Sequence, residues 1–136
     1  MASAKKQILL VDDEKLIRFS LLAALENDSV TIATAASGAD ALVRAAALDN
    51  CRLCVVDLYL PDMNGIELIR QLKRIHPGAS FIIITGKYRT KNDFLQHEKE
   101  AAGLGPFSFI PKPFDFPLTQ QLVNEALAGG TPAANE

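Results

Sequence analysis

Hydrophobic residues gather in five short, uninterrupted runs along the chain. Between the runs lie longer segments in which apolar residues recur every three or four positions. An uninterrupted apolar run is typical of a strand that is covered on both faces, and the three-to-four spacing is typical of an amphipathic helix. The predicted strands are Gln7–Val11, Val30–Thr34, Leu53–Val56, Phe81–Thr85 and Phe107–Ile110.

Five helices are predicted between and after these strands. The first is expected to place Leu16, Ile17, Leu21 and Leu25 on one buried face. The fourth, roughly Asn92–Ala102, has the fewest apolar residues to support it. Helix-capping and helix-breaking residues mark the start of the second helix and the ends of the third and fifth. These signals are Ser37-Gly38-Ala39-Asp40, Pro77-Gly78 and Gly129-Gly130.

Strict alternation of strands and helices predicts the fold class. It favours an α/β fold with a doubly wound parallel sheet and helices on both faces. A chain of 136 residues is within the range of about 100–200 residues for one domain. We expect a tail at 1–4, the domain at 5–128, and a linker or tail at 129–136. In such folds the functional groups lie at the carboxyl ends of the strands.

Charge and hydropathy exclude several classes of function. The chain has 14 basic and 16 acidic residues, which gives no basis for direct binding of nucleic acid or an anionic membrane. The longest apolar runs, such as Phe81–Ile84, are far too short to cross a bilayer. The basic residues near the N-terminus precede no long apolar stretch, so a signal peptide is not indicated. These features predict a cytoplasmic protein.

Cys51 and Cys54 form the one C-x-x-C motif of the chain. Redox and metal chemistry are the alternatives to a structural role for this pair. Cys54 lies inside the apolar run Leu53–Val56, and a four-cysteine zinc site would lack its other two ligands. The favoured interpretation is that Cys54 is a small, buried hydrophobic residue.

The predicted strands end in residues of one chemical kind. Asp12 and Asp13 follow the first strand, and Asp57 follows the third. Thr85 ends the fourth, and Lys112 comes shortly after the fifth. Each residue taken singly has a simpler interpretation, as a helix cap, a turn former or a solvated charge. Together they predict three carboxylates, a hydroxyl and an ammonium group at one edge of the sheet.

That combination of groups indicates phosphoryl transfer. Three neighbouring carboxylates repel one another, and a hard divalent cation, Mg²⁺ first, relieves the repulsion. Lys112 can offset the charge of a phosphoryl group, and Thr85 can donate a hydrogen bond to it. A carboxylate is a competent nucleophile for phosphoryl transfer under these conditions. The implied chemistry is formation and hydrolysis of an acyl phosphate on one Asp.

Three blocks of sequence resemble the receiver domains of response regulators in two-component signalling. The blocks are Ile8–Glu14 (ILLVDDE), Val55–Leu68 (VVDLYLPDMNGIEL) and Phe109–Phe114 (FIPKPF). The resemblance extends over about Lys5–Ala128. It implies a flavodoxin-like, five-stranded parallel sheet in the order 2-1-3-4-5, which is taken from the family.

The resemblance also implies a role for each residue at the strand ends. Asp57 would be the phosphoacceptor. Asp12 and Asp13 would hold Mg²⁺ together with Asp57 and the backbone carbonyl of Tyr59. Lys112 would pair with the phosphoryl group. The protein would then be a phosphoacceptor switch and not an enzyme acting on an external substrate.

The same resemblance implies a conformational switch. Thr85 would bond the phosphoryl group and couple it to Phe109, whose alternative role is core packing alone. The backbone N–H groups of Tyr59 and Gly86 would contact the phosphoryl group, and the Tyr59 side chain would lie over its entrance. The Lys112-Pro113 peptide resembles the cis peptide of the family.

The implied partners are a histidine kinase or a histidine phosphotransfer protein. An output domain or partner would bind the face made by the fourth helix, fifth strand and fifth helix, and phosphorylation-dependent homodimers are a further arrangement. From Thr85 to Lys112 there are 27 positions (112 − 85), about a helical turn more than is usual in the family.

Two other functions are open on the sequence. A haloacid-dehalogenase-type phosphatase would need an Asp where Tyr59 stands. A receiver-like module that takes no phosphate would be expected to lack one of the site residues, and all of them are present.

Overall fold

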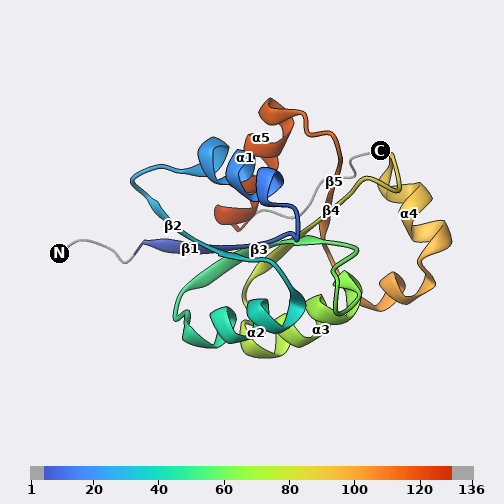
Figure 1. Ribbon diagram of the computed structural model, residues 1–136, viewed down its shortest axis with the longest axis horizontal. Coiled ribbons are helices and arrows are strands. Elements are labelled where there is room, and N and C mark those ends of the chain that lie inside the picture. Colours follow the sequence, from blue (N-terminus) through green and yellow to red (C-terminus); the bar gives the residue numbers. More distant parts are fainter. Residues whose placement is uncertain (1–4, 130–136) are drawn as a thin grey trace.

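Apolar strands covered on both faces build the sheet that the sequence predicts. The protein is described by a computed structural model over residues 5–129, so the predicted tail 1–4 and all but Gly129 of the predicted tail 129–136 lie outside the described residues. Five parallel strands pair in the order β2-β1-β3-β4-β5, which confirms the expected fold class (Figure 1). The strands are β1 (Lys6–Val11), β2 (Val30–Ala35), β3 (Cys51–Asp57), β4 (Ser80–Thr85) and β5 (Ser108–Pro111).

Helices cover the sheet on both sides. They are α1 (Lys15–Leu25), α2 (Gly38–Ala47), α3 (Gly65–Ile75), α4 (Lys91–His97) and α5 (Phe116–Leu127), with a 3-10 helix, η1 (Lys99–Gly103). In Figure 1, α1 and α5 lie above the sheet, α2 and α3 lie below it, and α4 lies beyond the β5 side. The strands lie within one or two residues of their predicted bounds; β5 begins and ends one residue later.

The sheet separates two apolar clusters. Successive side chains of a strand point to opposite faces, so Leu9 and Val56 pack toward α2 and α3, while Leu10 and Val55 pack toward α1 and α5. All four side chains are buried. This two-sided burial explains why the strands are continuous apolar runs in the sequence.

Polar side chains fix the starts of several helices. Ser37 accepts a hydrogen bond from the Asp40 N–H at 3.1 Å, which confirms the capping signal seen in the sequence. Asn64 caps α3 by accepting from the Ile66 N–H at 2.7 Å. Each bond satisfies a backbone N–H that has no partner within its helix.

Two expectations about the helices are wrong. Leu16 is 79% exposed, because the buried row of α1 runs through Leu21 and Leu25 and the half-buried Ile17, and Leu16 lies about 100° around the helix from Ile17. The predicted helix Asn92–Ala102 is instead two elements, α4 and η1, with a break at Glu98.

Basic residues of α3 support the segment that follows the break. Arg70 donates to the Glu100 carbonyl at 2.6 Å, and Lys73 donates to the Leu104 carbonyl. These bonds give partners to two backbone carbonyl groups of the segment after α4. These two bonds hold part of the segment between Thr85 and Lys112 against α3.

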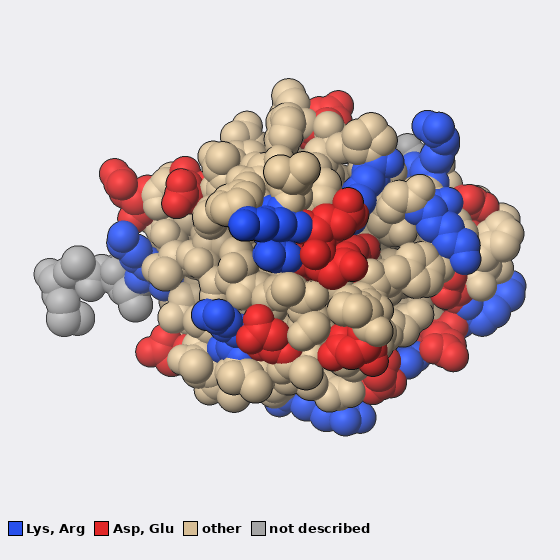
Figure 2. All heavy atoms as spheres, viewed as in Figure 1, with Lys and Arg blue, Asp and Glu red and all other residues tan. Residues whose placement is uncertain are grey.

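Acidic and basic side chains are mixed over the face shown in Figure 2, and neither sign covers it. This distribution agrees with the near balance of charges in the sequence. Among residues 5–129, no helix is long and apolar enough to cross a membrane.

Candidate functional site

The carboxyl edge of the sheet gathers four acidic side chains. Asp12 follows β1, Asp57 ends β3, and these strands are neighbours, so the two carboxylates converge. Asp13 and Glu14 follow Asp12 in the turn into α1. One carboxylate oxygen of each of these four residues lies within 4.8 Å of one oxygen of each of the others. Asp12 and Asp57 are buried, whereas Asp13 and Glu14 are exposed.

The ammonium group of Lys112 reaches this acidic cluster. The Lys112 Nζ lies 2.8 Å from Asp12 Oδ2, 3.0 Å from Glu14 Oε1 and 3.4 Å from Asp57 Oδ2. The Lys112 backbone N–H donates to the Thr85 carbonyl at 2.8 Å, which extends the pairing of β4 and β5 and fixes where the side chain starts. The Lys112-Pro113 peptide is cis, as the resemblance implies.

Burial and mutual repulsion make the carboxylates hard to ionise. Burial raises the pKa of Asp57 to about 6, and the neighbouring charge of Asp12 adds to the shift. Burial also raises the pKa of Asp12, although Lys112 and the Glu14 backbone N–H work in the opposite direction. Burial opposes the charge on Lys112, but its contacts with Asp12 and Glu14 outweigh this and raise its pKa. The edge therefore has an excess of negative charge that one lysine does not balance.

The donor set suits a hard divalent cation. Asp12 Oδ2 is buried and makes no aligned hydrogen bond, although the Lys112 ammonium is near it. Carboxylate oxygens are the ligands that Mg²⁺ and Ca²⁺ take in proteins. The residues present therefore fit a bound metal ion.

Comparison with known proteins assigns this arrangement to a family. Residues 8–124 match the family described as the response regulator receiver domain. The chain belongs to this family.

Relatives of this receiver domain occur in longer proteins. The chain is 34% identical over 127 residues to the DNA-binding transcriptional regulator NtrC of Azospirillum brasilense, covering 93% of this chain and 25% of NtrC. It is 32% identical over 126 residues to the sensor kinase CckA of Brucella abortus, covering 92% of this chain and 13% of CckA. The chain thus spans a quarter or less of these two relatives.

Solved structures support the same assignment. The receiver domain protein (CheY-like) of Methanospirillum hungatei superposes with a TM-score of 0.80 at 27% identity, covering 93% of this chain and 96% of that chain. The receiver domain of two-component response regulators is therefore both the sequence family and the fold of this chain.

The other predicted site residues of this receiver domain lie after β3, at the end of β4 and within β5. Thr85 is buried at the end of β4, and its Oγ1 accepts from the Lys87 N–H at 3.1 Å. The Tyr59 N–H lies 3.4 Å from Asp57 Oδ1. Gly86 follows Thr85 and has room for a Cβ, the nearest atom being the Lys112 Cβ at 3.8 Å. Phe109 is fully buried in β5, so its ring is inside the core.

Two features of this site were missed in the sequence. Glu14 is a fourth carboxylate and pairs with Lys112; its position directly after Asp12-Asp13 was a signal that could have found it. The Tyr59 and Tyr88 hydroxyls both donate to Glu98 Oε2. No local signal points to this second feature, because it depends on where the break after α4 places Glu98.

The cysteine pair lies away from the acidic cluster. Cys51 and Cys54 are free and buried, with their Sγ atoms 3.7 Å apart, so the expected burial of Cys54 is confirmed. The pairing of β3 with β1 is irregular between Cys51 and Leu53, which turns Cys51 to the same side as Cys54.

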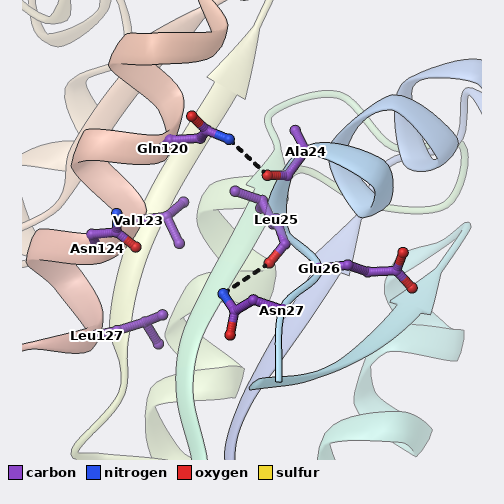
Figure 3. A pocket seen from close by; sticks show the side chains of 8 residues that line it. All are labelled: Ala24, Leu25, Glu26, Asn27, Gln120, Val123, Asn124 and Leu127. Carbon is purple, nitrogen blue, oxygen red and sulfur yellow. Dashed lines mark hydrogen bonds between the residues drawn. The ribbon is translucent and has the colours of Figure 1, made fainter. Parts of the chain in front are cut away.

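A hollow of about 280 Å³ lies between the end of α1 and α5 (Figure 3). Its amide side chains are partly engaged, since Gln120 donates to the Ala24 carbonyl at 3.0 Å and Asn27 to the Leu25 carbonyl at 3.5 Å. Its lining contains no Lys, Asp or Cys. It also lies near the end of α1 that is remote from the acidic cluster.

Proposed function

We propose that Asp57 accepts a phosphoryl group from a histidine kinase or a histidine phosphotransfer protein. The observation that carries the proposal is the setting of the Asp57 carboxylate, which is buried, 3.4 Å from the Lys112 ammonium and surrounded by three further carboxylates. Asp57 unites a nucleophilic oxygen with charge compensation on one side and a candidate metal site on the other.

The transfer step follows from these groups. An Asp57 carboxylate oxygen attacks the phosphorus atom of a phosphohistidine, the new P–O bond forms as the P–N bond breaks, and the released imidazole nitrogen takes up a proton. Lys112 compensates the negative charge of the arriving phosphoryl oxygens. The Thr85 hydroxyl, which accepts a bond from Lys87, has its own hydrogen to donate to a phosphoryl oxygen. The N–H groups of Tyr59 and Gly86 complete the set of donors.

Mg²⁺ completes the site in this proposal. Asp12, Asp13, Asp57 and the backbone carbonyl of Tyr59 would hold the ion. When bound, the ion offsets carboxylate repulsion and polarises the phosphoryl oxygens. Support comes from the excess of carboxylates over ammonium groups and from the buried Asp12 Oδ2 that lacks an aligned hydrogen bond.

In this proposal, phosphorylation changes the conformation of the face made by α4, β5 and α5, and this change is the output signal. Thr85 moves toward the phosphoryl group, and Phe109 responds to the space that it leaves. Phosphorylation biases two states that already exist, since a ligand shifts an equilibrium only through contacts that differ between the states. We assign residues 5–128 to the receiver domain; a partner protein, an output domain or a second phosphorylated copy would bind this face.

Intact mass measurement tests the proposal. The full chain is incubated with Mg²⁺ and a small acyl phosphate as phosphodonor. We expect one added phosphoryl group in the wild type and none in Asp57→Asn, whereas Asp28→Asn, at an exposed loop carboxylate, behaves as the wild type. Phosphorylation that persists in Asp57→Asn would show that another residue is the nucleophile.

A further inference from the structure

Asp62 joins the loop after β3 to the start of α2. Its Oδ1 accepts a hydrogen bond from the Gly38 N–H at 2.8 Å, and its Oδ2 accepts one from the Ala39 N–H at 2.9 Å. Both N–H groups belong to the first turn of α2, where the helix itself offers no acceptor. The two oxygens of one carboxylate therefore connect segments that are 24 and 23 residues apart in the sequence.

The charge of Asp62 suits this contact. A helix N-terminus stabilises a negative charge, and hydrogen bonds to a charged acceptor are stronger than those to a neutral one. The bonds from Ala39 and Gly38 accordingly lower the pKa of Asp62, so its carboxyl group is ionised at neutral pH. Met63 packs at the same place. A Cβ added at Gly38 would lie 2.1 Å from the Met63 Sδ, so the glycine leaves the room that this side chain occupies.

Two backbone hydrogen bonds close the loop. The Leu60 N–H donates to the Met63 carbonyl at 3.3 Å, and the Gly65 N–H donates to the Leu58 carbonyl at 2.7 Å. Tyr59 lies between these two bonds, in a single antiparallel bridge. The N–H and C=O groups of a residue at such a position point away from the opposite side of the bridge. The Tyr59 carbonyl is therefore directed outward, where it can serve as a ligand.

The two sides of Tyr59 are held in different ways. On one side, Leu58 is buried and its N–H donates to the Ile84 carbonyl of β4 at 3.0 Å. On the other side, Pro61 and Asp62 are exposed, and the bonds of Asp62 to α2 tie this part of the loop to the domain. An exposed turn that loses such bonds gains conformational freedom. Loss of the Asp62 carboxylate should therefore loosen the backbone of Tyr59 from the exposed side.

We propose that Asp62 is a positioning residue that acts through the backbone of Tyr59 and raises the affinity of the site for Mg²⁺. The inference rests on the proposed function, in which the Tyr59 carbonyl is one of the groups that hold the ion. Mg²⁺ requires a nearly ideal octahedral arrangement of its ligands. A ligand that is already fixed in place loses less conformational entropy when the ion binds. Asp62 supplies this order from outside the site, with both of its oxygens bonded to α2.

An NMR titration of the full chain with Mg²⁺ tests the inference. We expect Asp62→Ala to raise the dissociation constant for Mg²⁺ several-fold, because the Tyr59 carbonyl is no longer held. Asp62→Asn keeps one acceptor oxygen and should recover part of the affinity. The matched control is Asp40→Ala, which removes a carboxylate from the same turn of α2 and leaves the bonds of Asp62 intact, so its dissociation constant should equal that of the wild type.

The rate of phosphorylation supplies a second measurement that a general loss of structure would not imitate. Each variant is mixed with a small acyl phosphate over a range of Mg²⁺ concentrations, and the added mass is followed. In Asp62→Ala, the Mg²⁺ concentration that gives half of the maximal rate should rise several-fold, while the rate at saturating Mg²⁺ stays close to that of the wild type. A variant that was only partly folded would instead lose maximal rate at an unchanged half-saturating concentration.

The outcomes separate this inference from the proposed function. A wild-type protein that neither binds Mg²⁺ nor takes up phosphate overturns the proposed function and the inference with it. A wild-type protein that does both, with the same Mg²⁺ dependence in Asp62→Ala, overturns the inference alone. Equal weakening in Asp62→Ala and Asp40→Ala also overturns it, because the lost charge would then explain the effect.

Discussion

Replacing Asp57 by Asn should stabilise the metal-free protein at neutral and alkaline pH. Asp57 is only 5% exposed, and its pKa is raised from 3.8 to about 6, chiefly by burial. The fold therefore favours the neutral carboxyl group, and charging it above about pH 6 destabilises the native state. Asn has nearly the same shape and carries no charge, so the variant should escape this destabilisation.

The difference between the pKa of Asp57 in the folded protein and its ordinary value sets the size of this destabilisation. Each pKa unit corresponds to about 1.4 kcal/mol, so ionised Asp57 destabilises the fold by about 3 kcal/mol at high pH. The full effect is present above the folded pKa, it shrinks between about pH 6 and pH 4, and it vanishes below the ordinary value of 3.8. Loss of the Lys112 contact in Asp57→Asn offsets part of the gain, which leaves an expected stabilisation of about 1 to 3 kcal/mol.

Denaturant unfolding in the presence of a chelator measures this difference. Wild type, Asp57→Asn and the exposed control Asp28→Asn are compared at about pH 8 and about pH 5. We expect the free energy of unfolding of Asp57→Asn to exceed that of the wild type at the higher pH. This difference should fall by roughly half at the lower pH. A variant less stable than the wild type at pH 8, or a gap that does not change with pH, would refute the reasoning.

Three further predictions concern the metal, a tight turn and the output. Millimolar Mg²⁺ should raise the melting midpoint relative to chelator, by about 2.7 kcal/mol of stability at a hundredfold excess over Kd, and the double variant Asp12→Ala/Asp13→Ala should abolish the rise in calorimetry. Gly65→Ala should destabilise the protein by about 1 to 3 kcal/mol in denaturant titrations, because its Cβ would lie 2.4 Å from the last carbonyl oxygen of β3, whereas Gly78→Ala meets nothing within 4 Å and should be silent. A beryllium fluoride complex bound in place of the phosphoryl group should change hydrogen-exchange protection most between 86 and 110; changes limited to the loops after β1 and β3 would contradict the proposed switch.

Most of the fold could be predicted because both faces of the sheet are buried. A strand such as β3, covered by helices on two sides, is apolar at nearly every position and therefore conspicuous in the sequence. The helix ends marked by Ser37 and Pro77-Gly78 were also local signals. The prediction for Leu16 was wrong because an apolar residue next to the buried row of a helix cannot be distinguished, from the sequence alone, from a residue of that row.

Part of the candidate site could also be predicted from the sequence. Asp12, Asp57 and Lys112 converge because parallel strands end at one edge, a rule that needs no knowledge of the side-chain contacts. The contact of Glu98 with Tyr59 could not be predicted, since it requires the helix after β4 to stop at His97. Bonds from α3 to the Glu100 and Leu104 carbonyls accompany this break, and such long-range contacts leave no local signal in the sequence.

The two apolar clusters on opposite sides of the sheet have a consequence for how the domain can diversify. One cluster is closed by α2, α3 and Phe94 of α4, and the other by α1 and α5, with the strands between them. A substitution in α5 therefore disturbs the packing against α1 more directly than the packing against α3, because side chains in a protein interior pack closely against their immediate neighbours. Descendants of this sequence could remodel one helical layer for a new partner while the other layer and the sheet that carries Asp57 remain unchanged.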